Sequence, residues 1–211
     1  MKTLLRELTT SLLLTLLFAV LLCGVYPVVV WGGAQLLFKD QANGSLMMDK
    51  SGTVRGSSLL AQSFTSAKWF QPRPSAAGTG YDTTNSGGTN FGPTSQKLAD
   101  SVKAAVAAYR TANGLAADTE VPADAVTSSG SGLDPHISVA NALFQAARVA
   151  KARGLPLEQV KALVAQRTEG RDFGVFGESR VNVLLLNIDL EGTQPDKAVE
   201  APSGGGGGRG G

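Results

Sequence analysis

LLLTLLFAVLLCGVYPVVVW, the stretch from Leu12 to Trp31, decides how this chain is organised. No charged residue occurs between Glu7 and Lys39. A helix rises about 1.5 Å per residue, so about 20 such residues cross a hydrocarbon core of roughly 30 Å. We therefore predict a transmembrane helix over residues 12–34, with Pro27 late in the span, where a kink is tolerated.

A cleaved secretory signal and a lipoprotein signal are the two alternative interpretations of this stretch. Lys2 and Arg6 match the basic start of a signal peptide, and residues 32–34 (GGA) offer small residues to a peptidase. The apolar core of a signal peptide is about 7–15 residues long, however, and this one is longer. A lipoprotein signal would use Cys23, but Leu22 stands where a small residue is needed. The length therefore favours an uncleaved anchor.

The charges beside the span predict its orientation. The N-terminal tail carries Lys2, Arg6 and the α-amine against Glu7 alone, while the flank after the span is mixed in charge. Because cytoplasmic flanks are the ones enriched in Lys and Arg, we place residues 1–11 in the cytoplasm. The rest of the chain would then lie on the other side of the membrane.

The composition after the span indicates one domain without covalent cross-links. A segment of roughly 160 residues can build one core and is short for two. Lys and Arg are interleaved with Asp and Glu at a formal net charge of +2, which argues against a nucleic-acid partner. The single cysteine lies in the span, so no disulfide is expected. One histidine and one cysteine exclude a His/Cys metal site, whereas carboxylate metal sites stay open.

We expect an α/β or α+β domain over residues 51–191, with a small sheet and about three helices. Residues 35–50 would form a polar connector before it, and strand pieces should surround Gly56. The glycine-rich residues 192–211 cannot bury a core and should form a disordered tail.

Start and stop signals predict three helices in this domain. The first should begin with Thr94 or Ser95 as its N-cap and end at Gly114. The second should begin with Asp134 as its cap and Pro135 at its first position, and end at Gly154. The third should follow Leu155-Pro156 and run through Gln166. The buried stripe predicted for the second helix is Ile137, Ala140, Phe144 and Ala147.

The segment VNVLLLNIDL, residues 181–190, is apolar on both faces. A strand covered on both sides has this pattern, so we predict an interior strand of the small sheet.

Two loops and one proline-rich segment are candidates for a binding surface. Residues 76–92 hold five glycines among Ser, Thr and Asn, and a loop of that length is either functional or mobile. Residues 121–132 form a second polar loop. Arg73 lies between two prolines, which restrain it, and it should pair with a carboxylate inside the domain or across an interface.

Two patterns resemble catalytic motifs, and each has a simpler explanation. The pentapeptide DKSGT at 49–53 is close to the DKTGT phosphorylation motif of P-type ATPases, but the chain has no room for the nucleotide domain that phosphorylation requires. Ser128, Ser129 and Ser131 precede Asp134 and His136, which would suggest a hydrolase if they converged. Neighbours at one helix start converge poorly, and no G-x-S-x-G elbow is present. The same helix start could hold an anion, or it could simply be a satisfied cap.

Six motifs together carry a resemblance to a known family. They are QPRPSA at 71–76, YD at 81–82, SGGTNFGPTS at 86–95, VPADAVTSSGSGLDPHIS at 121–138, ANALFQAARVA at 140–150 and VNVLLLNIDL at 181–190. From the span to Leu190 the chain resembles the C subunit of the bacterial Kdp-type potassium-transporting ATPase.

The resemblance implies a non-catalytic accessory subunit. In that complex a channel-like subunit translocates K⁺ and a P-type subunit hydrolyses ATP, so ATP, Mg²⁺ and K⁺ would be used by the complex while this chain binds no cofactor. The chain would be a single-pass protein of the bacterial inner membrane with a periplasmic domain, in contact with both subunits and with lipid. From the matched motifs we select Arg73, Ser75, Asn90, Ser131 and Asp134 as candidate partner contacts.

Two other classes of function remain open from the residues alone. One is a free-standing, membrane-anchored periplasmic binding module with the loops 78–92 and 127–134 as its ligand cleft. The other is an anchored hydrolase that would depend on Ser131 or His136.

Overall fold

The computed structural model describes residues 2–48 and 52–193 of this chain, which divides into two compact units, residues 1–57 and 58–211. Most of the DKSGT pentapeptide and most of the predicted glycine-rich tail lie outside the described residues, so both predictions remain untested.

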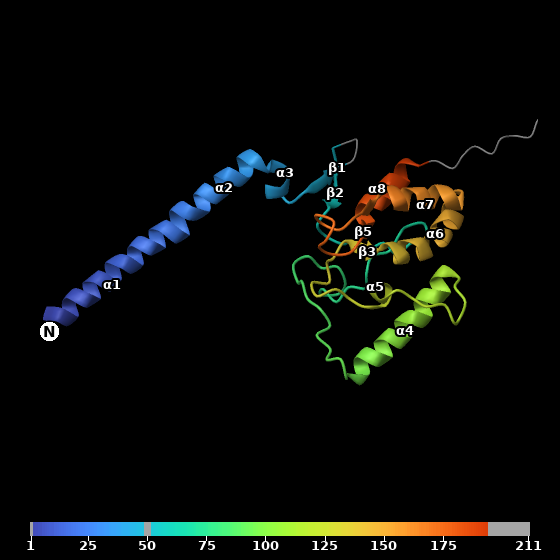
Figure 1. The fold of residues 1–211 in the computed structure, drawn as a ribbon, viewed down its shortest axis with the longest axis horizontal. Helices are drawn as coiled ribbons and strands as arrows, with labels where there is room; N and C mark the ends of the chain where they lie inside the picture. The colour runs from blue at the N-terminus through green and yellow to red at the C-terminus, as the bar shows by residue number, and fades with distance from the viewer. Residues whose placement is uncertain (1, 49–51, 194–211) are drawn as a thin grey trace, which may run out of the picture. The chain divides into compact units, whose positions relative to one another are not determined.

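The first unit begins with a single apolar helix of 36 residues, Lys2–Leu37, which is long and apolar enough to cross a membrane (Figure 1). It consists of α1 (Lys2–Val20), the π-helical turn η1 (Leu21–Val25) and α2 (Tyr26–Leu37). Its large apolar side chains are exposed along the whole length, for example Leu36, Val29 and Leu13. In water such a surface would be unfavourable, so lipid or protein must cover it. The membrane span over residues 12–34 stays a prediction.

The π turn lies directly before Pro27. Proline has no N–H, and its ring collides with the carbonyl four residues back, which here belongs to Cys23. The turn widens instead, and the N–H of Tyr26 donates to the carbonyl of Leu21, five residues back. Earlier in the helix the Thr15 hydroxyl donates to the carbonyl of Ser11 over 2.8 Å, as polar side chains do inside apolar helices.

The helix is followed by a short turn and a hairpin. These are α3 (Lys39–Ala42), β1 (Leu46–Met48) and β2 (Val54–Ser57), and β1 pairs antiparallel with β2. The predicted strand pieces around Gly56 are confirmed by β2. The segment predicted as a polar connector therefore contains regular structure, and Ser57 helps to hold it by donating from its hydroxyl to the carbonyl of Gly44 over 2.7 Å.

The second unit is a mixed helical and antiparallel domain, which confirms the α+β alternative. Its elements are α4 (Gln96–Asn113), α5 (Ala123–Val126), β3 (His136–Ser138), α6 (Val139–Arg153), α7 (Leu157–Gln166), β4 (Thr168–Glu169), β5 (Arg180–Asn182) and α8 (Val183–Gly192). The three strands form one antiparallel sheet in the order β3-β5-β4, in which Ile137 and Thr168 both pair with Val181.

The helices α4 and α7 confirm their predictions. The first has Ser95 in an extended conformation before it and ends at Gly114, whose φ of 65° is the left-handed cap that glycine adopts most easily. The second follows Pro156 and ends at Gln166. α4 has a local signal at each end, whereas α7 has one at its start, Pro156.

The helix predicted to begin at Asp134 and Pro135 is wrong at its start. His136–Ser138 is instead strand β3, and α6 begins four residues later, with Ser138 as the N-cap that accepts from the N–H of Asn141. Pairing with β5 overrides the capping signal, because tertiary hydrogen bonds outweigh a local preference. The predicted buried stripe is also wrong for α6, whose buried residues are Asn141, Ala142, Gln145, Ala146, Val149 and Ala150.

The long strand predicted over residues 181–190 is also wrong. Arg180–Asn182 forms β5, which is the central strand as predicted, but Val183–Gly192 is the helix α8. The Asn182 side chain accepts from the N–H of Leu185 and so starts the helix. The helix is buried on several sides, which explains why its sequence lacks a one-faced pattern.

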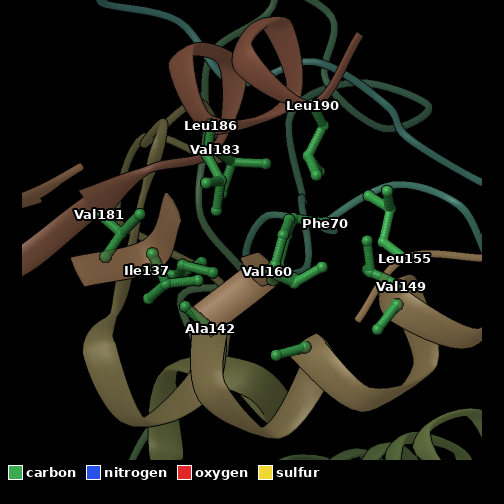
Figure 2. Packing of buried hydrophobic residues seen from close by; sticks show 13 residues of the cluster. Phe70, Ile137, Ala142, Val149, Leu155, Val160, Val181, Val183, Leu186 and Leu190 are labelled. Atoms are coloured by element: carbon green, nitrogen blue, oxygen red, sulfur yellow. The ribbon is translucent and has the colours of Figure 1, made fainter. Parts of the chain in front are cut away.

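The core is formed by α6, α7, α8, the sheet and two residues from irregular segments, Phe70 and Leu155. Figure 2 shows Val183, Leu186 and Leu190 extending from α8 into the space around Phe70, with Val160 of α7 beside it. Phe70 and Val160 are fully buried. Phe70 therefore fixes the extended chain that follows it, and this chain carries the candidate site.

Candidate functional site

An extended segment, Gln71–Ser75, is held against the helices by buried amide side chains. Asn187 of α8 accepts from the N–H of Phe70 and donates to its carbonyl, each over 2.9 Å. Gln145 of α6 does the same for Gln71, at 2.8 and 3.0 Å. Each amide takes the place of a neighbouring strand, so the backbone of the segment is satisfied without joining the sheet.

Gln145 is also the centre of a buried hydrogen-bond network. Its Nε2 donates to Asn141 Oδ1 over 2.9 Å, and its Oε1 accepts from Arg148 over 2.7 Å. The hydroxyl of Tyr109 donates to Asn141 Oδ1 over 2.8 Å, which connects α4 to α6. Burial, reinforced by the nearby charge of Asp124, raises the pKa of Tyr109 above its ordinary value, so this hydroxyl stays a donor.

Two glycine-rich loops are joined to the end of the Gln71–Ser75 segment. The hydroxyl of Ser75 donates to the carbonyl of Gly132 over 2.7 Å and accepts from the N–H of Tyr81 over 2.8 Å. The carbonyl of Ser131 accepts from the N–H of Gly87 over 2.9 Å. Gly132 has a φ of 68°, and a Cβ there would lie 2.7 Å from the backbone of Ala77 and of Gly87. The loops therefore approach each other as closely as backbone allows.

Arg73 ties the second loop to this segment. Its guanidinium donates to the carbonyl of Ser128 over 3.2 Å, to the carbonyl of Thr127 over 3.4 Å and to Asp134 Oδ2 over 3.4 Å. Its own carbonyl accepts from the hydroxyl of Tyr81 over 2.8 Å. The sequence left open whether Arg73 pairs inside the domain, and the structure shows that it does.

A charged cleft of about 490 Å³ opens beside these loops. It is lined by Arg73, Asp124, Asp134, His136, Ile137, Ser138, Glu178, Ser179 and Arg180. Two arginines and three carboxylates are among its lining residues, so the cleft suits a polar surface of mixed charge better than a simple anion or cation. Asp124 is held at its edge by the hydroxyl and the N–H of Ser138, each over 2.8 Å.

His136, the single histidine, lies between two carboxylates in this cleft. Its Nδ1 is 3.3 Å from Asp134 Oδ1, and its Nε2 is 3.9 Å from Glu169 Oε2. The hydrogen bond with His136 lowers the pKa of the Asp134 carboxyl, and the Arg73 cation adds to the effect. Asp134 is therefore a stable anion that fastens β3 to the Gln71–Ser75 segment.

A second cavity of about 360 Å³ is lined by residues of the same segment. Gln71, Pro72 and Pro74 line it, whereas Arg73 lines the charged cleft. Its other walls include Tyr81, Tyr109, Asn141 and Gln145. The Gln71–Ser75 segment thus contributes to both a charged cleft and a polar, aromatic cavity.

The structure brings four of the five predicted contact residues together. Arg73 and Asp134 line the charged cleft, while Ser75 and Ser131 join the loops behind it. Asn90 is exposed in a left-handed conformation, with a φ of 52°, and is not among the residues that line the cleft. Whether any of them touches a partner stays a prediction.

The sequence did not single out the buried amides or Glu178 and Arg180. Asn141 and Gln145 are four residues apart among alanines, and that spacing places both on one helix face. This spacing could have been used to predict a buried pair of polar side chains. Glu178 and Arg180 reach the cleft only through the β3-β5 pairing, which local sequence does not reveal.

Comparison with known proteins identifies the family. The family model described as "K+-transporting ATPase, c chain" matches residues 8–192. The chain belongs to the KdpC family. A potassium-transporting ATPase KdpC subunit from Koribacter versatilis is 53% identical over 191 residues, which cover 90% of this chain and 96% of that protein. The KdpC subunit of Rhodospirillum rubrum is 54% identical over 187 residues, covering 89% and 96%.

A KdpC subunit from Mycobacterium tuberculosis H37Rv is 52% identical over 186 residues, which cover 88% of this chain and 98% of the relative. All three relatives are matched over nearly their full length. The family resemblance predicted from the motifs is therefore confirmed.

Proposed function

We propose that this chain is the accessory subunit of an ATP-driven, high-affinity potassium uptake complex, and that it supports the assembly of a channel-like K⁺-translocating subunit with a P-type ATPase subunit. Membership of the KdpC family carries this proposal. An apolar helix that can cross a membrane supports it, because such a helix can lie beside other membrane subunits.

The chain itself is non-catalytic in this proposal. Both ring nitrogens of His136 face carboxylates, so neither is aimed at a serine hydroxyl. The hydroxyl of Ser131 accepts from the N–H of Leu133, which is a local turn contact. ATP, Mg²⁺ and K⁺ would be bound by the partner subunits, and this chain would bind no cofactor.

The proposed topology is a single pass through the bacterial inner membrane. The N-terminus would be cytoplasmic, since its short tail carries Lys2 and Arg6 against Glu7. The second unit would then be periplasmic, near the entrance for K⁺, and the span would dock laterally on the channel-like subunit. Lipid would cover the rest of the helix.

The test is to prepare the ATPase with and without this chain and to measure K⁺-stimulated ATP hydrolysis. We expect stable, K⁺-stimulated complex only when the chain is present. The single variants Ser131→Ala and His136→Ala should keep the full turnover, because neither residue performs chemistry. Full activity without the chain, or its loss in either variant with assembly intact, would contradict the proposal.

A free-standing periplasmic binding module remains the second candidate function, because of the 360 Å³ cavity beside Tyr81 and Tyr109. The loops 78–92 and 127–134, which the sequence suggested as the ligand cleft, are hydrogen-bonded to each other through Gly87 and Ser131. The cavity, and not this pair of loops, would therefore hold the ligand. A chain that is isolated without partners and binds a small molecule would favour this alternative.

A further inference from the structure

Residues Arg171–Glu178 form a loop with an apolar end, which we call the aromatic tip. The side chains of Phe173, Val175 and Phe176 are 95%, 69% and 67% exposed. Outside the long apolar helix these are among the most exposed large apolar residues of the described chain, and they lie within four positions of one another. The folded domain does not need them for its core, since none belongs to the core cluster.

The aromatic tip is held in one conformation. Asp172 and Phe176 exchange backbone hydrogen bonds in both directions, at 2.8 and 2.9 Å, and the N–H of Gly174 donates to the carbonyl of Arg171 over 3.0 Å. Phe173 adopts a φ of 53°, which is uncommon for a bulky residue. An exposed phenylalanine that is held in this way is prepared for binding, because little conformational entropy remains to be lost.

Ion pairs close the base of the aromatic tip. Arg171 contacts both carboxylate oxygens of Glu178, at 2.8 and 2.7 Å. Arg180 contacts Glu169 over 3.0 Å and Asp172 over 3.5 Å. The two arginines are thus paired with three carboxylates, which leaves one net negative charge around the apolar end.

The charges around the aromatic tip favour a protein surface over a lipid surface as its binding partner. Segments that lie on membranes present free Lys or Arg to the headgroups, together with Trp or Tyr at the interface. Both arginines here are already paired, and residues 169–180 contain no Lys, Trp or Tyr. An apolar end on a slightly negative base instead complements an apolar pocket with a basic rim on a protein.

We infer that the aromatic tip inserts Phe173 and Phe176 into an apolar, basic-rimmed pocket on another protein subunit of the potassium-transporting ATPase. The inference rests on the proposed function, since it names a contact by which the accessory chain holds its partner. The base of the tip also forms a wall of the charged cleft, through Glu178 and Arg180. A partner that covers the tip therefore reaches the cleft as well, where Arg73 and Asp134 present polar contacts around the apolar anchor.

The first test uses photochemical cross-linking in the complete complex. The full chain, with photoreactive benzoylphenylalanine in place of Phe173, is produced together with the other subunits and irradiated in the membrane. We expect a covalent adduct with a protein subunit, identified by mass spectrometry. The same group in place of Leu143, an exposed apolar residue of α6, is the control and should give much less of that adduct. An adduct with lipid alone, an adduct with a second copy of this chain, or no adduct would each overturn the inference.

The second test separates this inference from the proposed function. The triple variant Phe173→Ser, Val175→Ser, Phe176→Ser keeps the ion pairs and should unfold at the same temperature as the parent chain. Its association with the partner subunits should be weaker by roughly tenfold or more, the size expected when central apolar anchors are removed. Leu143→Ser, at an exposed apolar residue of α6, should leave association unchanged. Undiminished association of the triple variant would overturn the inference and leave the accessory role standing, whereas a parent chain without partners would overturn both.

Discussion

Gln145 and Gln159 lie on neighbouring helices but have opposite surroundings. Gln145 is 1% exposed, and its side chain bonds with the backbone of Gln71, with Asn141 and with Arg148. Gln159 has a buried Oε1 without a hydrogen-bond partner in the described part of the chain. A satisfied buried amide stabilises a fold, whereas an unsatisfied one costs desolvation energy.

This contrast predicts opposite outcomes for one substitution. Gln145→Leu removes the hydrogen-bond partners of the N–H and the carbonyl of Gln71 and of one guanidinium nitrogen of Arg148. We therefore expect it to lower the free energy of unfolding by about 3 kcal/mol. Gln159→Leu, the matched control, should change it by less than about 0.5 kcal/mol, or stabilise the chain slightly. Urea unfolding of the full chain in detergent measures both. Equal losses in the two variants would show that the network around Gln145 has no special role.

Asp134 predicts how stability depends on pH. Its pKa is lowered in the folded state, first by the hydrogen bond with His136, so the folded chain binds fewer protons than the unfolded chain in acid. The stabilisation is complete above the unfolded pKa of about 3.9 and is lost as the pH falls through the folded pKa.

The variant Asp134→Asn should therefore be less stable than the parent at pH 7, and the difference should shrink towards pH 3. Asp118→Asn, at an exposed carboxylate, is the control and should follow the parent at every pH. The measurement is the unfolding midpoint of the full chain between pH 3 and 7. A constant difference between Asp134→Asn and the parent would contradict the assignment of Asp134 as the group that titrates.

At the scale of elements, local signals predicted those helices whose ends are marked by caps. α4 ends at a left-handed glycine, and α7 follows a proline, so their limits could be read from the sequence. The apolar stretch before Phe38 was equally clear, and the structure forms a helix there. The widened turn before Pro27 is the feature of this helix that the sequence did not predict.

Both wrong predictions concern residues at the β3-β5 pairing. β3 is one strand of this pair, and α8 directly follows the other strand. Asp134 and Pro135 resemble a helix start, yet the residues that follow pair with β5. Residues 183–190 are buried on several sides, and a fully buried helix has the same continuous apolar pattern as a buried strand. Leucine favours helices, and Asn182 is a good cap, so composition contained a signal that the apolar pattern masked.

For the molecule as a whole, the sequence predicted the family and two residues that line the charged cleft, Arg73 and Asp134, but not how the site is built. Four of the six motifs that carry the resemblance fold into the Gln71–Ser75 segment, the two joined loops and the edges of the cleft, and the other two form most of α6, β5 and α8. Their serines and glycines serve mainly to bring loop backbones together. The charged groups that face outward come partly from Glu178 and Arg180, which a distant strand pairing delivers.

In the proposed function, this KdpC-family chain acts by binding other subunits and not by chemistry of its own. The most direct measurement is gentle detergent extraction of the tagged chain from potassium-starved cells, followed by mass identification of the proteins that remain bound. We predict a channel-like subunit and a P-type ATPase subunit in stable association, with K⁺-stimulated ATP hydrolysis in the isolated complex. A monodisperse chain without partners would contradict the account and would direct attention to the cavity beside Tyr81 and Tyr109 as a ligand site.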